Sequence, residues 1–334
     1  MHFADFHCDT ISELFHRKQD ITQTLRNNSL QLDADRLYHA NYLLQHFAVF
    51  IDRKQYENPY ETALDMLDYY QEQLSLCKDM LHPIYQAKDL DTSIATHKVG
   101  AIATIEEGGI LDFNIERLDT LYEKGVRLLT LTWNYDNCIG SPSKLYYGQD
   151  VFPTIPNTSY GLTPFGIEVV RRCEELGILV DVSHLSDAGF VDAASCTTKP
   201  FVASHSSARA LCPHVRNLSD DMIRTIADRG GLIGINFCPA FVEPAPSGVN
   251  PHIQWAPYGT IHAIVRHIRH VYNTGGLACL SLGSDFDGIN RYLELDDVTC
   301  MPQLYEALKK DGFHESEIDA ILYQNMIQFY RYSL

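Results

Sequence analysis

The sequence contains no run of apolar residues that approaches the length of a membrane-spanning helix, and no basic N-terminal segment followed by a long apolar run. A spanning helix needs about 20 consecutive apolar residues, and a secretory signal needs both a basic segment and an apolar run. The sequence therefore predicts a cytoplasmic protein without membrane attachment.

Basic residues are scarce. Lys and Arg number 26 against 43 Asp and Glu, which sets the formal net charge at −17. Nucleic acids and anionic membrane surfaces are recognised through basic patches, so we expect neither as a partner. The acidic surplus does not identify a substrate, because it is typical of a solvated protein surface.

The nine cysteines include no C-x-x-C pair and are spread along the chain. An odd number of scattered cysteines does not fit a disulfide framework or a zinc–thiolate site. Free cysteines are among the most buried residue types. The pattern therefore predicts reduced, mostly buried thiols.

Short apolar runs alternate with helical patterns along the chain, without an internal repeat or a low-complexity linker. The predicted strands are 3–9, 44–51, 99–106, 126–133, 177–184, 200–205, 231–238 and 278–285. The predicted helices are 58–76, 115–124, 164–176, 219–229, 259–273 and a final helix over 314–332. Near-continuous apolar strands are typical of a parallel sheet covered on both faces, and eight of them alternating with helices is the count of a closed barrel. We predict an α/β fold with a single (β/α)8 TIM barrel over residues 1–334 and the final helix packed outside it.

Residues at the ends of the predicted helices support their boundaries. Gly125, Gly177 and Gly230 stand where helices end and favour C-caps there. Ser186 and Ser219 precede helical patterns as N-caps do.

Two long loops are predicted, over 134–160 and 239–257. Both follow the carboxyl ends of predicted strands, which is the end of a barrel where active sites lie. Loops of this length in a compact domain are usually functional.

Six ionisable residues stand at the carboxyl ends of five predicted strands: His7, Asp9, Glu106, His184, His205 and Asp285. His7 and Asp9 are two apart on one strand, so their side chains point to the same side, into the mouth of the barrel. Burying such groups together without a cation is costly in desolvation and mutual repulsion. The convergence therefore predicts a metal site.

The types of ligand indicate which metal and how many ions. Imidazole and carboxylate ligands without a thiolate favour zinc, with manganese or iron as alternatives. Three imidazoles and three carboxylates exceed one tetrahedral shell. A pair of ions bridged by a carboxylate uses them better, and such pairs catalyse hydrolysis. We expect two Zn²⁺ per chain.

Six segments of the sequence resemble the membrane (renal) dipeptidase family of zinc-dependent dipeptidases. They are HCD (7–9), IEEGG (105–109), LVDVSHLSD (179–187), ASHSSAR (203–209), VRNLSDD (215–221) and GSDFDG (283–288). The resemblance runs in order from residue 3 to near the C-terminus. It implies a barrel of the metallo-dependent hydrolase type that binds two zinc ions and splits dipeptides through a metal-bridging hydroxide.

The resemblance also implies the roles of the metal ligands: His7 and Asp9 on one zinc, His184 and His205 on the other, and Glu106 as the bridge. Glu107 is the rival for the bridge, because the family's Glu-Gly-Gly aligns with either glutamate. The spacing to the LTLT segment favours Glu106.

Further roles follow from the same resemblance. Asp285 would be the acid/base group near the substrate amine, and Arg216 would bind the substrate carboxylate. Where animal members carry a histidine that stabilises the tetrahedral oxyanion, this chain has Trp133. We expect Trp133 and Asn134 to line the substrate site, with oxyanion stabilisation from Asn134 or a metal ion.

Two other functions remain open at this stage. One is a different metal-dependent amidohydrolase, acting on N-acyl amino acids, cyclic amides or lactones, because barrel scaffolds host many chemistries. Arg216 and the lack of a lysine after strand 126–133 favour a dipeptidase. The other is a non-catalytic barrel that only binds a ligand, against which the complete ligand set argues. The sequence leaves open the preferred dipeptides, the tolerance of D-residues and a homodimer.

Overall fold

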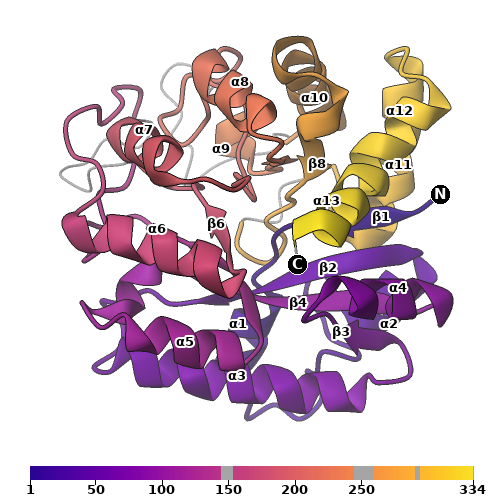
Figure 1. The fold of residues 1–334 in the computed structure, drawn as a ribbon. Helices are drawn as coiled ribbons and strands as arrows, with labels where there is room; N and C mark the ends of the chain where they lie inside the picture. The colour runs from indigo at the N-terminus through magenta and orange to yellow at the C-terminus, as the bar shows by residue number, and fades with distance from the viewer. Residues whose placement is uncertain (144–152, 244–258, 290–293, 334) are drawn as a thin grey trace.

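A computed structural model describes residues 1–143, 153–243, 259–289 and 294–333 (Figure 1). Its strands are β1 (Phe3–Asp5), β2 (Tyr42–Phe50), β3 (Leu81–Pro83), β4 (Val99–Glu106), β5 (Val126–Thr130), β6 (Leu179–Asp181), β7 (Ile233–Ile235) and β8 (Leu280–Leu282). Its α-helices are α1 (Thr10–His16), α2 (Ala34–His39), α3 (Pro59–Leu76), α4 (Ala87–Ala95), α5 (Glu116–Glu123), α6 (Pro164–Leu176), α7 (Asp187–Cys196), α8 (Asp220–Asp228), α9 (Pro239–Val242), α10 (Ile261–Gly275), α11 (Met301–Lys310), α12 (Glu315–Asp319) and α13 (Asn325–Ser333). Short 3₁₀ turns η1 (Gly108–Leu111), η2 (Leu277–Cys279) and η3 (Val298–Cys300) and a π-helical turn η4 (Ala320–Gln324) complete the elements.

The parallel strands curl into a closed barrel with helices outside (Figure 1). One run is ordered β1-β2-β4-β5-β6, and a second pairs β7 with β8. The segment 202–203 forms single parallel bridges to β6 and β7, and Cys8 forms one to Phe286 that joins β8 to β1. The predicted (β/α)8 fold is therefore confirmed, with residues 200–205 in the place of a strand but making isolated bridges only.

Most strands are shorter than the sequence predicts: β1, β5, β6, β7 and β8 end three or more residues early, and the last three also begin two residues late. Strand 177–184 is reduced to β6, and strand 278–285 to β8. The residues that leave the sheet early include His184 and Asp285, whose φ angles of 67° and 65° are incompatible with a strand. β3, a three-residue strand containing a proline, was not predicted; it pairs with the first part of β4, and β5 pairs with the last part.

The helix boundaries follow the local signals. α6 coincides with the prediction, and α3, α5, α8 and α10 agree to within two residues. The hydroxyls of Ser186 and Ser219 accept hydrogen bonds from the first-turn amides, as N-caps do. Gly125, Gly177 and Gly230 have positive φ after helix ends. Helices α1, α2, α4, α7 and α11 were not predicted.

One extra residue in β1 turns the next histidine toward the barrel interior. Asp5 lies opposite Gln45, but the Ala48 amide donates to the Cys8 carbonyl, so β1 contains one residue more than β2 between these points. Such a bulge re-aims side chains. Phe6 and His7 then both face inward, while Cys8 packs in the outer core between the sheet and the helices.

The C-terminal helical segment is divided into α12, η4 and α13. Met326 and Tyr330 of α13 are fully buried in the core inside the barrel, where Tyr330 packs against Phe6. The Tyr330 hydroxyl donates to Nε2 of the buried His46 at 2.6 Å. α13 therefore covers the amino-terminal end of the barrel, opposite the predicted site.

The nine cysteines are all free thiols, as the sequence predicts. Among the described helices, none combines the length and apolar character that a membrane crossing requires. Parts of the two predicted long loops, 144–152 and 244–258, lie outside the described residues, and residues 239–242 of the second form α9.

Candidate metal centre

The structure brings the predicted metal ligands together at the carboxyl end of the barrel, where all are buried. His7 and Asp9 follow β1, Glu106 is the last residue of β4, and His184 and His205 follow β6 and the segment 202–203. These residues are far apart in the sequence. They meet because the carboxyl ends of parallel barrel strands share one rim.

Glu106 lies at the centre of the cluster, and its two oxygens face different histidines. Oε2 is 3.2 Å from His7 Nε2. Oε1 is 3.1 Å from His184 Nε2 and 3.6 Å from His205 Nε2. This carboxylate can therefore contact two ions at once.

A second group of acidic side chains surrounds His7. Its Nε2 is 3.3 Å from Asp9 Oδ2 and 3.9 Å from Asp285 Oδ1. Two sets of ligand atoms lie within 4.8 Å of one another: His7 with Glu106 and His205, and His7 with Asp9 and Asp285. The cluster thus provides two adjoining groups that could each hold a cation.

The donor set fits metal binding. Zinc–nitrogen and zinc–oxygen bonds of about 2.0–2.2 Å in a tetrahedral shell set neighbouring ligand atoms roughly 3.3–3.6 Å apart. The contacts of Glu106 to the three imidazoles match that separation, and the Nε2 atoms of His184 and His205 are 3.0 Å apart. Both ring nitrogens of His7 and Oδ1 of Asp9 are buried without a hydrogen-bond partner among the described residues. Buried polar atoms are normally paired, and a cation would satisfy these.

Without a cation, the charges of the cluster depend on His7. Burial alone would lower the pKa of His7, but Glu106 and Asp9 outweigh burial and raise it well above its usual value. Burial disfavours the charged form of Glu106, yet His7 and His184 outweigh it and lower the pKa of that carboxyl. Burial raises the pKa of Asp9 to about 7 and that of Asp285 to about 6. The site therefore contains more carboxylates than one imidazolium can balance.

Glu107, the rival for the bridging position, points elsewhere. It has a φ of 94°, so its side chain turns away from that of Glu106. Its carboxylate accepts hydrogen bonds from the amides of Gly109 and Trp133, at 2.8 and 2.9 Å, and lies 3.2 Å from Arg53 Nε. Glu106 therefore lies among the imidazoles, whereas Glu107 stabilises the loops after β4 and β5 through hydrogen bonds to their backbone amides.

Two hydrogen bonds orient the imidazoles of His184 and His205. His184 Nδ1 donates to Asn134 Oδ1 at 3.0 Å, so Asn134, expected to line the substrate site, also contacts the cluster through its carbonyl oxygen. His205 Nδ1 donates to Ser204 Oγ at 2.7 Å, which in turn donates to Asp181 Oδ2 at 2.6 Å. Such contacts fix the tautomer and leave Nε2 to face a metal.

Sequence reasoning missed Asp181 and Ser204. Both lie within predicted strands, at the same end as the ligands. That position is the signal that could have identified them.

Asp285 is held in place by two further residues that the sequence analysis missed. Asn236 Nδ2 donates to Asp285 Oδ2 at 2.9 Å. A Cβ atom at Gly288 would lie 2.1 Å from Asp9 Oδ2 and 2.6 Å from Asp285 Oδ1, so only glycine fits beside the two carboxylates. Asn236 lies near the carboxyl end of the predicted strand 231–238, which is the signal for it; the role of Gly288 depends on three-dimensional packing.

Arg216 is buried beside the cluster. Its Nη1 donates to Ser206 Oγ at 2.9 Å and its Nη2 to the His205 carbonyl at 3.1 Å, while Nε has no partner. In the part of the chain that the structure describes, no carboxylate lies within 4.0 Å of this guanidinium, since no ion pair of Arg216 is present. A buried cation without an anionic partner is suited to bind a carboxylate.

Trp133 lies at the edge of the cluster. Its ring centroid is 6.5 Å from the ring centroid of His184. The indole packs against Phe50 and Tyr135, with centroid distances of 4.9 and 5.3 Å. The indole therefore forms an apolar wall next to a predicted metal ligand, where the sequence analysis expected substrate.

Comparison with known proteins shows where this arrangement occurs. The family profile of membrane dipeptidase (peptidase family M19) matches residues 1–332. An uncharacterized protein in the pqqA 5′ region of Klebsiella pneumoniae is 34% identical over 271 residues, which cover 79% of this chain and 96% of that protein. Dipeptidase tcpJ of Claviceps purpurea is 27% identical over 322 residues, which cover 93% of this chain and 71% of that protein. A metallo peptidase from Rhodobacter sphaeroides, solved with a phosphinate mimic of the dipeptide L-Ala-D-Ala, has the same fold, with a TM-score of 0.87 and 22% identity over 100% of this chain and 99% of that chain.

The neighbouring glutamates make a matched pair for mutation. We expect Glu106→Gln to remove at least one bound metal ion per chain, because it weakens the carboxylate that faces three imidazoles. Glu107→Gln should keep the metal content of the wild type and lower the free energy of unfolding by about 1–3 kcal/mol, since it disturbs a buried, charge-assisted hydrogen-bond network. Metal analysis by mass spectrometry and urea unfolding test both variants. Metal loss in Glu107→Gln alone would assign the bridge to Glu107.

Proposed function

The chain belongs to the membrane dipeptidase family (peptidase family M19) and is a metal-dependent dipeptidase, and we propose that it hydrolyses the peptide bond of dipeptides with two zinc ions bound side by side. The observation that carries the proposal is the position of Glu106, whose two oxygens face His7 on one side and His184 and His205 on the other. Family membership confirms the resemblance that the sequence motifs indicate.

Five residues would hold the metals. His7 and Asp9 would bind one ion, His184 and His205 the other, and Glu106 would contact both. Imidazole and carboxylate ligands suit zinc, with manganese and iron as alternatives. The chemistry that two bound ions would supply is a water of lowered pKa, available as hydroxide near neutral pH, and polarisation of the scissile carbonyl.

Asp285 is the residue we propose to move the proton. Its Oδ1 is near the His7–Asp9 pair, and its Oδ2 is fixed by Asn236. From this position the carboxylate can take a proton from the attacking water and pass it to the leaving amine, which is the work of a general base and then a general acid.

Arg216 and the residues after β5 would bind the substrate. The guanidinium of Arg216 offers a planar fork to the terminal carboxylate of a dipeptide, which favours substrates that end one residue after the scissile bond. Trp133 would pack against the substrate side chain. Asn134 uses its carbonyl oxygen on His184, so its amide nitrogen is the donor we propose for the developing oxyanion.

Metal content and a substrate panel test the proposed function together. We expect two metal ions per chain and turnover of unblocked dipeptides. N-acetyl amino acids, cyclic dipeptides and lactones should be cleaved at least 100-fold more slowly, because they lack the amine or the carboxylate that the site would bind. Mass spectrometry of the purified protein and product analysis provide the measurements. Equal turnover of N-acetyl amino acids or lactones would instead assign the site to another amidohydrolase.

Asp285→Asn separates proton transfer from metal binding. We expect kcat on dipeptides to fall by about 10²–10⁴-fold while the metal content stays at the wild-type value, because the amide keeps the shape of the side chain but cannot accept the proton. Loss of one metal ion in this variant would make Asp285 a ligand, and an unchanged kcat would exclude its role in proton transfer.

Arg216→Ala tests the binding of the substrate carboxylate. We expect KM for a dipeptide to rise by roughly 30-fold, which corresponds to about 2 kcal/mol for hydrogen bonds to a charged group, with a smaller change for the corresponding dipeptide amide. Steady-state kinetics on the two substrates provide the comparison. If both substrates lose the same affinity, Arg216 supports the loop rather than the carboxylate.

A further inference from the structure

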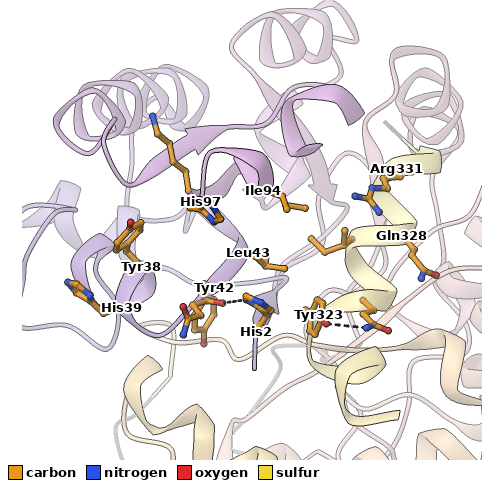
Figure 2. Close-up of a pocket in the computed structure, with 14 residues that line it drawn as sticks. His2, Tyr38, His39, Tyr42, Leu43, Ile94, His97, Tyr323, Gln328 and Arg331 are labelled. Carbon is orange, nitrogen blue, oxygen red and sulfur yellow. Dashed lines mark hydrogen bonds between the residues drawn. The ribbon is translucent and has the colours of Figure 1, made fainter. Parts of the chain in front are cut away.

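A large cavity lies at the amino-terminal end of the barrel, away from the metal centre. It has a volume of about 790 Å³ and is bounded by residues that precede β1, β2 and β4 and by η4 and α13 (Figure 2). His2 lies between Tyr42 and Tyr323. Gln328 and Arg331 line the cavity from α13. Cavities of about 300–1,000 Å³ are the size of small-molecule sites.

The lining of the cavity is rich in hydrogen-bond donors and contains no carboxylate. None of its 14 described lining residues is acidic, although the chain has 43 acidic residues against 26 basic ones. Three imidazoles, from His2, His39 and His97, and the guanidinium of Arg331 contribute to the polar part. Asp91 pairs with Nε and Nη2 of Arg331, at 3.0 and 2.8 Å, but is not part of the lining.

Three aliphatic side chains form the apolar part of the lining. Leu43 and Ile94 lie beside His97 in the same view, and Ile327 of α13 is buried (Figure 2). The cavity therefore combines an apolar surface with donor groups at its edge. This combination matches a ligand that has an apolar body and an anionic group.

The backbone at two lining residues provides an independent observation. In six of the described turns from a helix into a strand, one residue has positive φ, and in four of them it is glycine: Gly125, Gly177, Gly230 and Gly276. In the turns before β2 and β4 the residues are Asn41 and His97, with φ of 60° and 55°. Glycine adopts this conformation without steric cost, so a side chain is kept here against local preference. Both side chains line the cavity.

We propose that this cavity is a second binding site, for a small organic anion with an apolar or aromatic body. The imidazoles and amides at its edge bind the anionic group, and Leu43, Ile94 and Ile327 contact the apolar body. His97 is present because its side chain contacts the ligand. The site is separate from the hydrolytic centre and does not depend on the dipeptidase assignment.

Fluorescence titration with 8-anilinonaphthalene-1-sulfonate tests the proposal, with N-phenyl-1-naphthylamine as the matched probe that lacks the sulfonate. We expect one sulfonate probe per chain and at least 10-fold weaker binding of the neutral probe. His97→Gly should weaken binding of the sulfonate at least 5-fold without lowering Tm, since glycine suits the turn. Gln328→Glu, which adds a charge without changing shape, should weaken it at least 10-fold.

Two controls separate the cavity from the rest of the surface. Ala95→Glu adds the same charge on α4 but outside the lining, and His262→Ala removes an exposed imidazole on α10. Both should bind the sulfonate probe within twofold of the wild type, and all four variants should retain turnover of dipeptides.

Three results would overturn the proposal. Equal affinity for the two probes would show that the cavity does not select an anion. Unchanged binding in Gln328→Glu and His97→Gly would place the probe elsewhere. Sedimentation that shows a dimer of the wild type, but monomers of these two variants, would identify a second copy of the chain as the occupant.

Discussion

The electrostatics of one buried cluster determines much of this structure. Glu106, Asp9 and Asp285 are brought together with three imidazoles at the end of a barrel, where water is too scarce to solvate their charge. Among the predicted ligands, a proton on His7, whose pKa the carboxylates raise, supplies a compensating positive charge. One proton cannot neutralise three carboxylates, whereas divalent cations can, and they also satisfy the unpaired atoms of His7 and Asp9.

The surrounding residues keep this cluster in a geometry that the backbone would not adopt by itself. His184 and Asp285 have positive φ, and Glu107 has the same unfavourable conformation next to Glu106. Strained residues of this kind persist where neighbouring contacts hold them, and they gather at functional sites. Here the contacts are specific: Asn134 holds His184, Asn236 holds Asp285, and the amides of two loops hold Glu107. The strain turns His184 and Asp285 out of the sheet and into the mouth of the barrel, and it turns Glu107 toward the loops.

The sequence was sufficient to predict the barrel and which residues would meet, because both follow from periodicity. Eight apolar runs mark the strands, and a polar residue at the carboxyl end of a run must lie on the common rim. Periodicity does not show where a strand leaves the sheet. The prediction therefore extended β6 through His184, and it could not tell that residues 202–203 make single bridges only.

The choice between Glu106 and Glu107 shows the same limit on a smaller scale. Adjacent residues on a strand point to opposite faces, so the pattern requires that only one of them enters the cluster, but it does not show which. The positive φ of Glu107 is a local departure from regular geometry, and the Glu107 carboxylate accepts a hydrogen bond from the Trp133 amide, which is distant in sequence.

The same departures from regular geometry distinguish the two ends of the barrel. At the carboxyl end, His184 and Asp285 of the metal cluster have positive φ. At the amino end it is found at Asn41 and His97, in turns where four equivalent positions are glycine. A side chain at positive φ is stable where a neighbouring contact compensates for the strain. For His184 and Asp285 that contact is the metal cluster. For Asn41 and His97 no packing in the core requires the side chain, because both residues are exposed. In the site proposed above, the ligand of the cavity supplies the compensating contact.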